Sequence, residues 1–114
     1  MLINPGEKVH VIYRAMYEGS LRRHFVGTVI AADGATCRVQ GYAFVTDPNT
    51  RMFERKADLR ETLVDLAHPG YIANLIPPDT EIDNVTYKYI RDYGLACTDG
   101  GSFTLNINEY GART

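Results

Sequence analysis

Apolar and polar residues alternate along the first third of the chain, which is typical of β-strands with one buried face. In residues 8–16, one face carries Val9, Val11, Tyr13 and Ala15, and the other carries Lys8, His10 and Arg14. Residues 21–32 then run into Asp33-Gly34, a strong signal for a two-residue hairpin turn, and residues 35–45 follow. The pattern predicts a strand over 8–16 and a hairpin formed by 21–32 and 35–45.

Pairing Ala32 with Ala35 sets a register for this hairpin. It places Ile30, Thr28 and Val26 opposite Cys37, Val39 and Gly41 on a core face, and Phe25 opposite Tyr42 on the other face. Gly27 and Gly41 inside strand patterns indicate sharp bends or a close approach of two backbones. Strongly bent strands allow a small sheet to close into a barrel.

The middle of the chain fits two kinds of secondary structure. Leu59, Leu63 and Leu66 recur at helical spacing, so a short helix over 57–66 is one reading. Residues 62–66 and 71–76, separated by His68-Pro69-Gly70, also form a strand pair, and this is the reading that we prefer.

The last third shows the same ambiguity. Residues 85–90 are β-branched and aromatic and favour a strand, whereas Ile82, Val85, Tyr89 and Tyr93 would form the stripe of a helix over 80–93. We prefer the strand. Residues 95–98 and 103–107 flank Asp99-Gly100-Gly101 and predict a terminal hairpin.

The composition indicates the general class of protein. The chain has 114 residues, of which 45% are hydrophobic and 23% charged, as expected of one globular domain over 1–114. Neither a membrane-spanning apolar run nor a secretory signal is recognisable, so we expect a cytoplasmic protein without membrane association. In that compartment Cys37 and Cys97 are expected to be reduced, buried thiols.

Catalytic and metal-binding signatures are not found. Neither serine lies in a nucleophile motif, and His10, His24 and His68 are too far apart in sequence to have metal-ligand spacing. Residues 79–90 start like a calcium loop but have Asn84 and Ile90 where Gly and Glu are needed. We therefore expect a non-enzymatic protein without cofactor or metal, and no small-molecule substrate is identified.

Charge is distributed unevenly, with a net +3 over residues 1–60 and −5 over 61–114. Basic side chains that lie beside aromatic rings are suited to phosphates and unpaired bases. The candidate nucleic-acid contacts are Arg22, Arg23, His24, Phe25 and Tyr42, with Arg55 and Lys56 as an electrostatic flank. The alternative is that these charges form a solvated face or a subunit contact. The eight tyrosines favour an interface and hence a homo-oligomer.

The order of these segments resembles the Sm/Lsm-like RNA-binding proteins. The similar segments are Val9-x-Val11, the glycine-containing strand 27–32 that ends at Asp33, and the strand–turn–strand unit over 63–76. The resemblance implies a small, strongly bent antiparallel β-barrel over 7–77 that associates into rings and binds RNA. That family reads bases with a Met-Asn pair and an Arg-Gly turn, which are replaced here by residues 34–37 and 67–70.

The expected fold is therefore mainly β, with the barrel core over 7–77 and an extension over 78–114 that is a hairpin or meander and could include one short helix. The expected function is a non-enzymatic Sm-like binding module for RNA or single-stranded nucleic acid, acting as a homo-oligomer. The alternative is a structural or assembly protein with protein-only interfaces.

Overall fold

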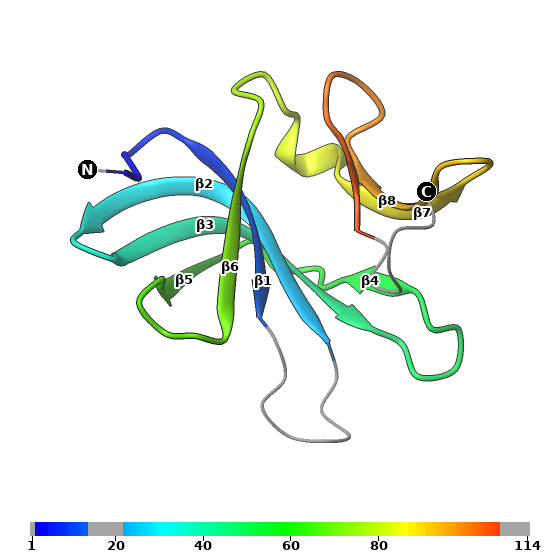
Figure 1. The fold of residues 1–114 in the computed structure, drawn as a ribbon, viewed down its shortest axis with the longest axis horizontal. Helices are drawn as coiled ribbons and strands as arrows, with labels where there is room; N and C mark the ends of the chain where they lie inside the picture. The colour runs from blue at the N-terminus through cyan, green and yellow to red at the C-terminus, as the bar shows by residue number, and fades with distance from the viewer. Residues whose placement is uncertain (1, 14–21, 108–114) are drawn as a thin grey trace.

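The protein is a mainly β structure, built of antiparallel sheets in a computed structural model that describes residues 2–13 and 22–107 (Figure 1). Strands make up 57% of the described residues, which contain no α-helix. None of the described helical segments is long and apolar enough to cross a membrane. The strands, in chain order, are β1 (Lys8–Tyr13), β2 (Arg23–Asp33), β3 (Thr36–Thr46), β4 (Phe53–Arg55), β5 (Arg60–Asp65), β6 (Tyr71–Ile76), β7 (Thr86–Ile90), β8 (Gly94–Thr98) and β9 (Thr104–Asn106), with the 3-10 turn η1 (Ile82–Asn84) before β7.

The first six strands form one curved sheet, which we call the N-terminal sheet. Its order is β4-β3-β2-β1-β6, and β5 pairs with the other half of β3. The 11 residues of β3 make this possible, because Thr36–Gly41 pair with β5 whereas Phe44–Thr46 pair with β4. Among the described strands, β5 and β6 pair only with β3 and β1, so strand pairing does not close the sheet. Arg14 and Ala15 of the first predicted strand lie outside the described residues.

The glycine pair behaves as its position in the strands predicts. Gly27 lies opposite Gly41 where β2 crosses β3. A Cβ atom on Gly41 would lie 2.0 Å from the carbonyl oxygen of Val26, and one on Gly27 would lie 2.3 Å from that of Gln40. The two backbones therefore approach too closely for any side chain, and the prediction of a close approach is confirmed.

The predicted hairpin register is wrong. The observed turn pairs Asp33 with Thr36, so Gly34 and not Asp33 is the first turn residue, and it has a positive φ of 61°. The register then shifts between Val29 and Ala31, which leaves Ile30 exposed instead of buried in the core. Past this bulge the pairs predicted for Phe25 and Tyr42 are replaced by Phe25–Ala43 and Val26–Tyr42. Turn position and a bulge together moved each partner by one or two residues.

Both ambiguous segments are strands. Residues 60–65 form β5 and residues 71–76 form β6, so the short helix over 57–66 is wrong. The predicted pairing of these two strands with each other is also wrong, because β5 pairs with β3 and β6 pairs with β1. Residues 86–90 form β7, which excludes a helix over 80–93; only the three-residue turn η1 is helical there. The terminal hairpin is confirmed as β8 and β9, and β7 extends it to a three-stranded meander, which we call the C-terminal sheet. The short strand β4 was not predicted.

Two hydrophobic cores use the opposite faces of the N-terminal sheet. The first core lies within that sheet and its N-terminal segment, and contains Ile3, Val9, Val11, Phe25, Val29, Cys37, Val39, Ala43 and Val64. The second core lies between the two sheets, and contains Val26, Phe44, Phe53, Ile76, Val85, Tyr87, Cys97, Phe103 and Ile107. Consecutive residues of β2, such as Phe25 and Val26, thus belong to different cores, because side chains alternate between the two faces of a strand.

Candidate functional site

A pocket of about 320 Å³ opens on the face of the N-terminal sheet that carries the first core. Five strands contribute to it, and its apolar part consists of Val11, Phe25, Ala43 and Val64. Its polar part consists of Tyr13, Arg23, Arg60, Thr62 and Tyr71. None of these lining residues is acidic. Its size and its mixture of apolar surface with a few polar groups are those of small-molecule and base-binding sites.

Curvature of the sheet brings the lining residues together from distant parts of the sequence. Tyr13 pairs with Arg23 on one side and with Tyr71 on the other, at the end of β1. The rings of Tyr13 and Tyr71 lie with their centroids 4.9 Å apart. His68 packs against both rings, at 6.3 and 5.8 Å, and its Nδ1 accepts a hydrogen bond from the Gly70 N–H at 2.9 Å. The rings of Tyr13 and Tyr71 therefore form an aromatic side of the pocket, and His68 packs against both of them.

The two arginines give the pocket its charge. Arg23 is exposed, and Arg60 is partly buried, with its Nη2 at 4.0 Å from the Asp58 carboxylate. An ion pair of this length with an exposed carboxylate contributes little, and Arg60 keeps donors for a ligand because a guanidinium has five N–H groups. The pocket is thus suited to a ligand with both a flat apolar part and a negative charge.

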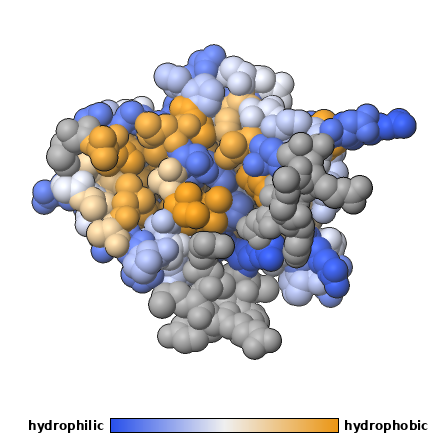
Figure 2. Space-filling view, viewed as in Figure 1, coloured by the Kyte–Doolittle hydropathy of each residue, from blue (hydrophilic) through white to orange (hydrophobic). Residues whose placement is uncertain are grey.

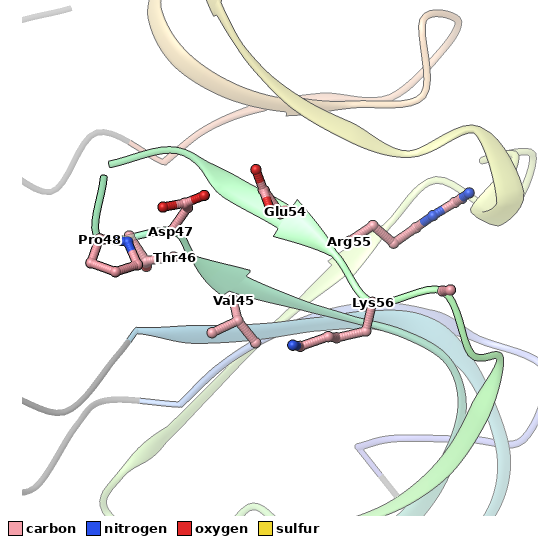
Figure 3. A pocket seen from close by; sticks show the side chains of 8 residues that line it. Val45, Thr46, Asp47, Pro48, Glu54, Arg55 and Lys56 are labelled. Atoms are coloured by element: carbon pink, nitrogen blue, oxygen red, sulfur yellow. The ribbon is translucent and has the colours of Figure 1, made fainter. Parts of the chain in front are cut away.

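The structure separates the seven residues that the sequence suggested as one site. Arg23 and Phe25 line the pocket, although Phe25 is only 7% exposed and forms part of its floor. Lys56 and Arg55 both line a second groove of about 390 Å³, which also contains Asp47 and Glu54, and their side chains point in opposite directions (Figure 3). Arg22 precedes β2, and its carbonyl accepts the Thr46 N–H at 3.1 Å.

The remaining two predicted residues, His24 and Tyr42, lie on the opposite face of the sheet, where the Arg55 guanidinium also makes its contacts. His24 is 1% exposed and lies in the second core, so it cannot contact a phosphate there. The Tyr42 hydroxyl donates to Asp83 at 2.9 Å, and the Arg55 guanidinium lies 4.6 Å from the centre of its ring. Arg55 also donates to the Asp83 carbonyl at 2.7 Å. Tyr42 and Arg55 therefore fasten the turn η1 to the N-terminal sheet, and the prediction of one cluster is wrong because side chains alternate along a strand.

Sequence reasoning missed Tyr13, Arg60, Thr62 and Tyr71 as site residues. Tyr13 was placed correctly on the same face as Val9 and Val11, but nothing in the sequence showed which residue of β6 would lie beside it. That information is the register of β1 with β6, in which Tyr13 pairs with Tyr71.

The described residues contain no group of three His, Cys, Asp or Glu side chains placed to hold a metal ion. Comparison of the chain with models of protein families, with curated proteins and with solved structures gives no match. What the pocket can do chemically is set by its own groups: it can surround a flat ligand with apolar and aromatic side chains while two arginines donate to its charged part.

Proposed function

We propose that this protein is a non-enzymatic binding module, Sm-like in type, that holds RNA or another single-stranded nucleic acid at the pocket of the N-terminal sheet. The observation that carries the proposal is the combination, in one cavity of about 320 Å³, of the Tyr13–Tyr71 ring pair with Arg23 and Arg60.

Each part of a nucleotide has a counterpart in this cavity. An unpaired base has two flat faces that pack on aromatic and apolar side chains, a contact worth about 1–3 kcal/mol per base. The phosphates on either side of that base match the planar donors of Arg23 and Arg60. Lys56 lies in a separate groove that Asp47 and Glu54 also line, so that groove adds no net positive charge to the pocket. Duplex nucleic acid would not fit, because its bases are stacked and cannot enter a pocket.

The proposed barrel and the Sm-like relationship are supported by the strand order. The segment over 7–77 contains β1 to β6, which form one continuous antiparallel sheet. The close Gly27–Gly41 crossing bends β2 and β3, and β6 returns to pair with β1. In this proposal the curved sheet is a barrel-like binding surface, with a base pocket that differs from the family's own.

The edges of the N-terminal sheet support a homo-oligomer. β5 and β6 each have six residues and one partner strand within the described part of the chain, so each has a side on which a second copy could pair. Leu63 on β5 and Leu75 on β6 are 63% and 59% exposed. Figure 2 shows apolar residues gathered on the face where β6 lies in front. These same features favour the second candidate function, an assembly protein with protein-only interfaces.

The decisive experiment measures binding of a fluorescein-labelled ten-nucleotide uridine RNA by anisotropy at several salt concentrations. The test protein is the double variant Arg23→Ala, Arg60→Ala. The control is the double variant Arg38→Ala, Arg91→Ala, which removes the same charge from two exposed arginines that do not line the pocket. We expect the test variant to weaken binding about tenfold or more and to lower the salt dependence, and the control to change it less than about threefold.

Equal losses in both double variants would mean that general charge and not the pocket attracts the RNA. No binding by the wild type at low salt, with a defined oligomer by light scattering, would favour the assembly protein. Light scattering of each variant also shows whether the oligomer is unchanged, so that a loss of RNA binding is not a loss of assembly.

A further inference from the structure

Two buried histidines of the N-terminal sheet meet one tyrosine of the C-terminal sheet. His10 on β1 and His24 on β2 are 0% and 1% exposed. The Tyr87 hydroxyl oxygen lies 3.0 Å from Nε2 of His10 and 2.8 Å from Nδ1 of His24. The two imidazole rings lie 5.0 Å apart at 89° to each other. The three side chains therefore form a polar link between the sheets inside the second core.

One arrangement of protons satisfies these contacts. The amide nitrogen of Asn74 lies 3.4 Å from Nδ1 of His10 and can only donate, so Nδ1 accepts and Nε2 carries the proton. Nε2 of His10 then donates to the Tyr87 oxygen, and the Tyr87 hydroxyl donates to Nδ1 of His24. The remaining nitrogen, Nε2 of His24, carries its proton without a partner among the described residues. The acceptor nitrogen of each imidazole is then in use, and a further proton would displace its hydrogen bond.

Aromatic rings surround the cluster. Phe53 packs on His24 with ring centroids 4.3 Å apart, and Phe44 packs on Tyr87 at 4.8 Å. The polar and titratable groups that face the cluster are Asn74 from β6, Cys97 from β8 and the positive charge of Arg22. In the part of the chain that the structure describes, neither imidazole has a hydrogen bond to a carboxylate.

Burial accordingly lowers the pKa of His10 to about 4. Burial also lowers the pKa of His24 to about 3, with the neighbouring His10 and Arg22 adding to the effect. Both rings are therefore neutral in the folded protein near pH 7, and both would become charged in mild acid if water reached them, since a free imidazole has a pKa near 6.5.

The chain segment 77–85 and side-chain contacts join the two sheets. No described strand of one sheet pairs with a strand of the other. Among the described residues, polar contacts also hold the connecting segment on the N-terminal sheet: the Lys8 ammonium donates to the Thr80 carbonyl at 2.7 Å, and Tyr42 and Arg55 contact Asp83. The first core contains no residue of the C-terminal sheet. The C-terminal sheet can consequently separate without breaking a strand pair of the N-terminal sheet or opening its first core.

We propose that the His10–Tyr87–His24 cluster is an acid-sensitive switch, in which protonation of both histidines releases the C-terminal sheet from the N-terminal sheet. The open state takes up one proton from solvent on each imidazole, and the closed state takes up neither. The population of the open state therefore rises by up to about a hundredfold for each pH unit below 6.5. Neutralisation returns the protons to solvent and restores the closed state.

The two cysteines provide a direct test in the wild-type protein. Cys97 is buried in the second core and Cys37 in the first. The protein is exposed to short pulses of 4,4′-dithiodipyridine, a reagent that modifies accessible thiols in acid, at pH values from 7 to 4.5. Mass spectrometry of the peptides then gives the labelling of each cysteine, corrected for the reactivity of a free thiol at that pH. We expect Cys97 labelling to rise steeply with acid, by up to about a hundredfold per pH unit, while Cys37 stays protected.

Matched variants identify the groups that take up the protons. His10→Gln and His24→Asn keep a polar atom near the nitrogen that contacts Tyr87 but do not titrate. Each should reduce the acid dependence of Cys97 labelling to about tenfold per pH unit. His68→Asn, which changes a histidine next to Tyr13 and Tyr71 instead, should leave it unchanged.

Three results would overturn the proposal. Equal labelling of Cys37 and Cys97 at every pH would show global unfolding instead of separation of the sheets. Protection of Cys97 down to pH 4.5 would show that the cluster does not open. An undiminished acid dependence in both folded histidine variants would assign the proton uptake to other groups. If a variant fails to fold, the comparison of the two thiols in the wild type still decides between the first two results.

Discussion

Replacing Gly41 with alanine tests the close crossing of β2 and β3. The new Cβ would lie 2.0 Å from the Val26 carbonyl oxygen and 2.5 Å from the Gly27 Cα. Both are backbone atoms, so no side-chain rotation relieves the clash. Because carbon atoms in contact lie about 3.5 Å apart or more, the strands must separate locally by about 1 Å.

A separation of that size removes the hydrogen bonds around this pair. About two ladder hydrogen bonds are lost, at about 1 kcal/mol each, and their buried groups are left without partners at a cost of about 1–3 kcal/mol each. We expect Gly41→Ala to lower the free energy of unfolding by roughly 3–5 kcal/mol, which is a large part of the stability of a domain of this size.

Urea denaturation followed by circular dichroism measures this change. Gly101→Ala is the matched control, because a Cβ there would meet nothing closer than the Asp99 carboxylate oxygen at 3.5 Å. The control should stay within about 0.5 kcal/mol of the wild type. A Gly41→Ala protein within about 1 kcal/mol of the wild type would refute the close crossing, as would equal losses in the two variants.

Three further predictions concern buried and turn polar groups. Tyr87→Phe removes the hydroxyl shared by His10 and His24 and should cost about 2–4 kcal/mol of unfolding free energy in urea, whereas Tyr89→Phe, at a residue that is 70% exposed, should cost almost nothing. The free energy of unfolding of the wild type should fall by about 4 kcal/mol between pH 7.5 and 5. The reason is that histidines of the unfolded chain bind protons below pH 6.5, whereas folded His10 and His24 have pKa values of about 4 and 3 and do not. A flat profile over this range would contradict the burial of both rings in their neutral form. Burial alone would raise the pKa of the Asp99 carboxyl, but hydrogen bonds from the backbone N–H groups of Glu81, Gly101 and Phe103 lower it below the usual value of 3.8. The difference in unfolding free energy between wild type and Asp99→Ala should therefore be largest above pH 3.8 and should shrink as the pH falls below it. An unchanged difference at pH 3 would show that these hydrogen bonds do not depend on the charge.

Local sequence signals were sufficient for most of the strands. Alternation predicted β1, β2 and β3, and β-branched and aromatic residues correctly favoured a strand at β7. The strand preferred at β5, before the turn His68-Pro69-Gly70, is also present. These signals are informative because a strand places alternate side chains on two faces, so a strand with one buried face has apolar residues at every second position. The close approach at Gly27 and Gly41 was also predictable, because glycine in the interior of a strand usually marks a bend or a close approach of two backbones.

The hairpin register could not be predicted in the same way. In the observed register, Gly34 is the first turn residue and Ile30 lies in a bulge. This register places Val29 opposite Val39, and both are buried in the first core. The sequence around the turn allows either choice locally, and only packing against β1 and β5 decides between them.

The candidate site shows the same division. Arg23 was identified from the sequence because basic residues next to aromatic ones are visible locally. Tyr71 and Arg60 join it only because β6 pairs with β1 and β5 pairs with β3. His24, which is adjacent to Arg23 in sequence, lies on the other face of the sheet and takes part in the buried cluster with His10 and Tyr87.

By itself, the sequence determined that this protein is a mainly β chain with bent central strands and a terminal hairpin, because those features depend on residues within a few positions of each other. The tertiary structure decided which side chains share the pocket, which histidines meet, and how the C-terminal sheet covers the N-terminal one. Those choices depend on the free energy of burying both faces of one sheet in two separate cores. That free energy comes from contacts between residues as far apart in sequence as His10 and Tyr87.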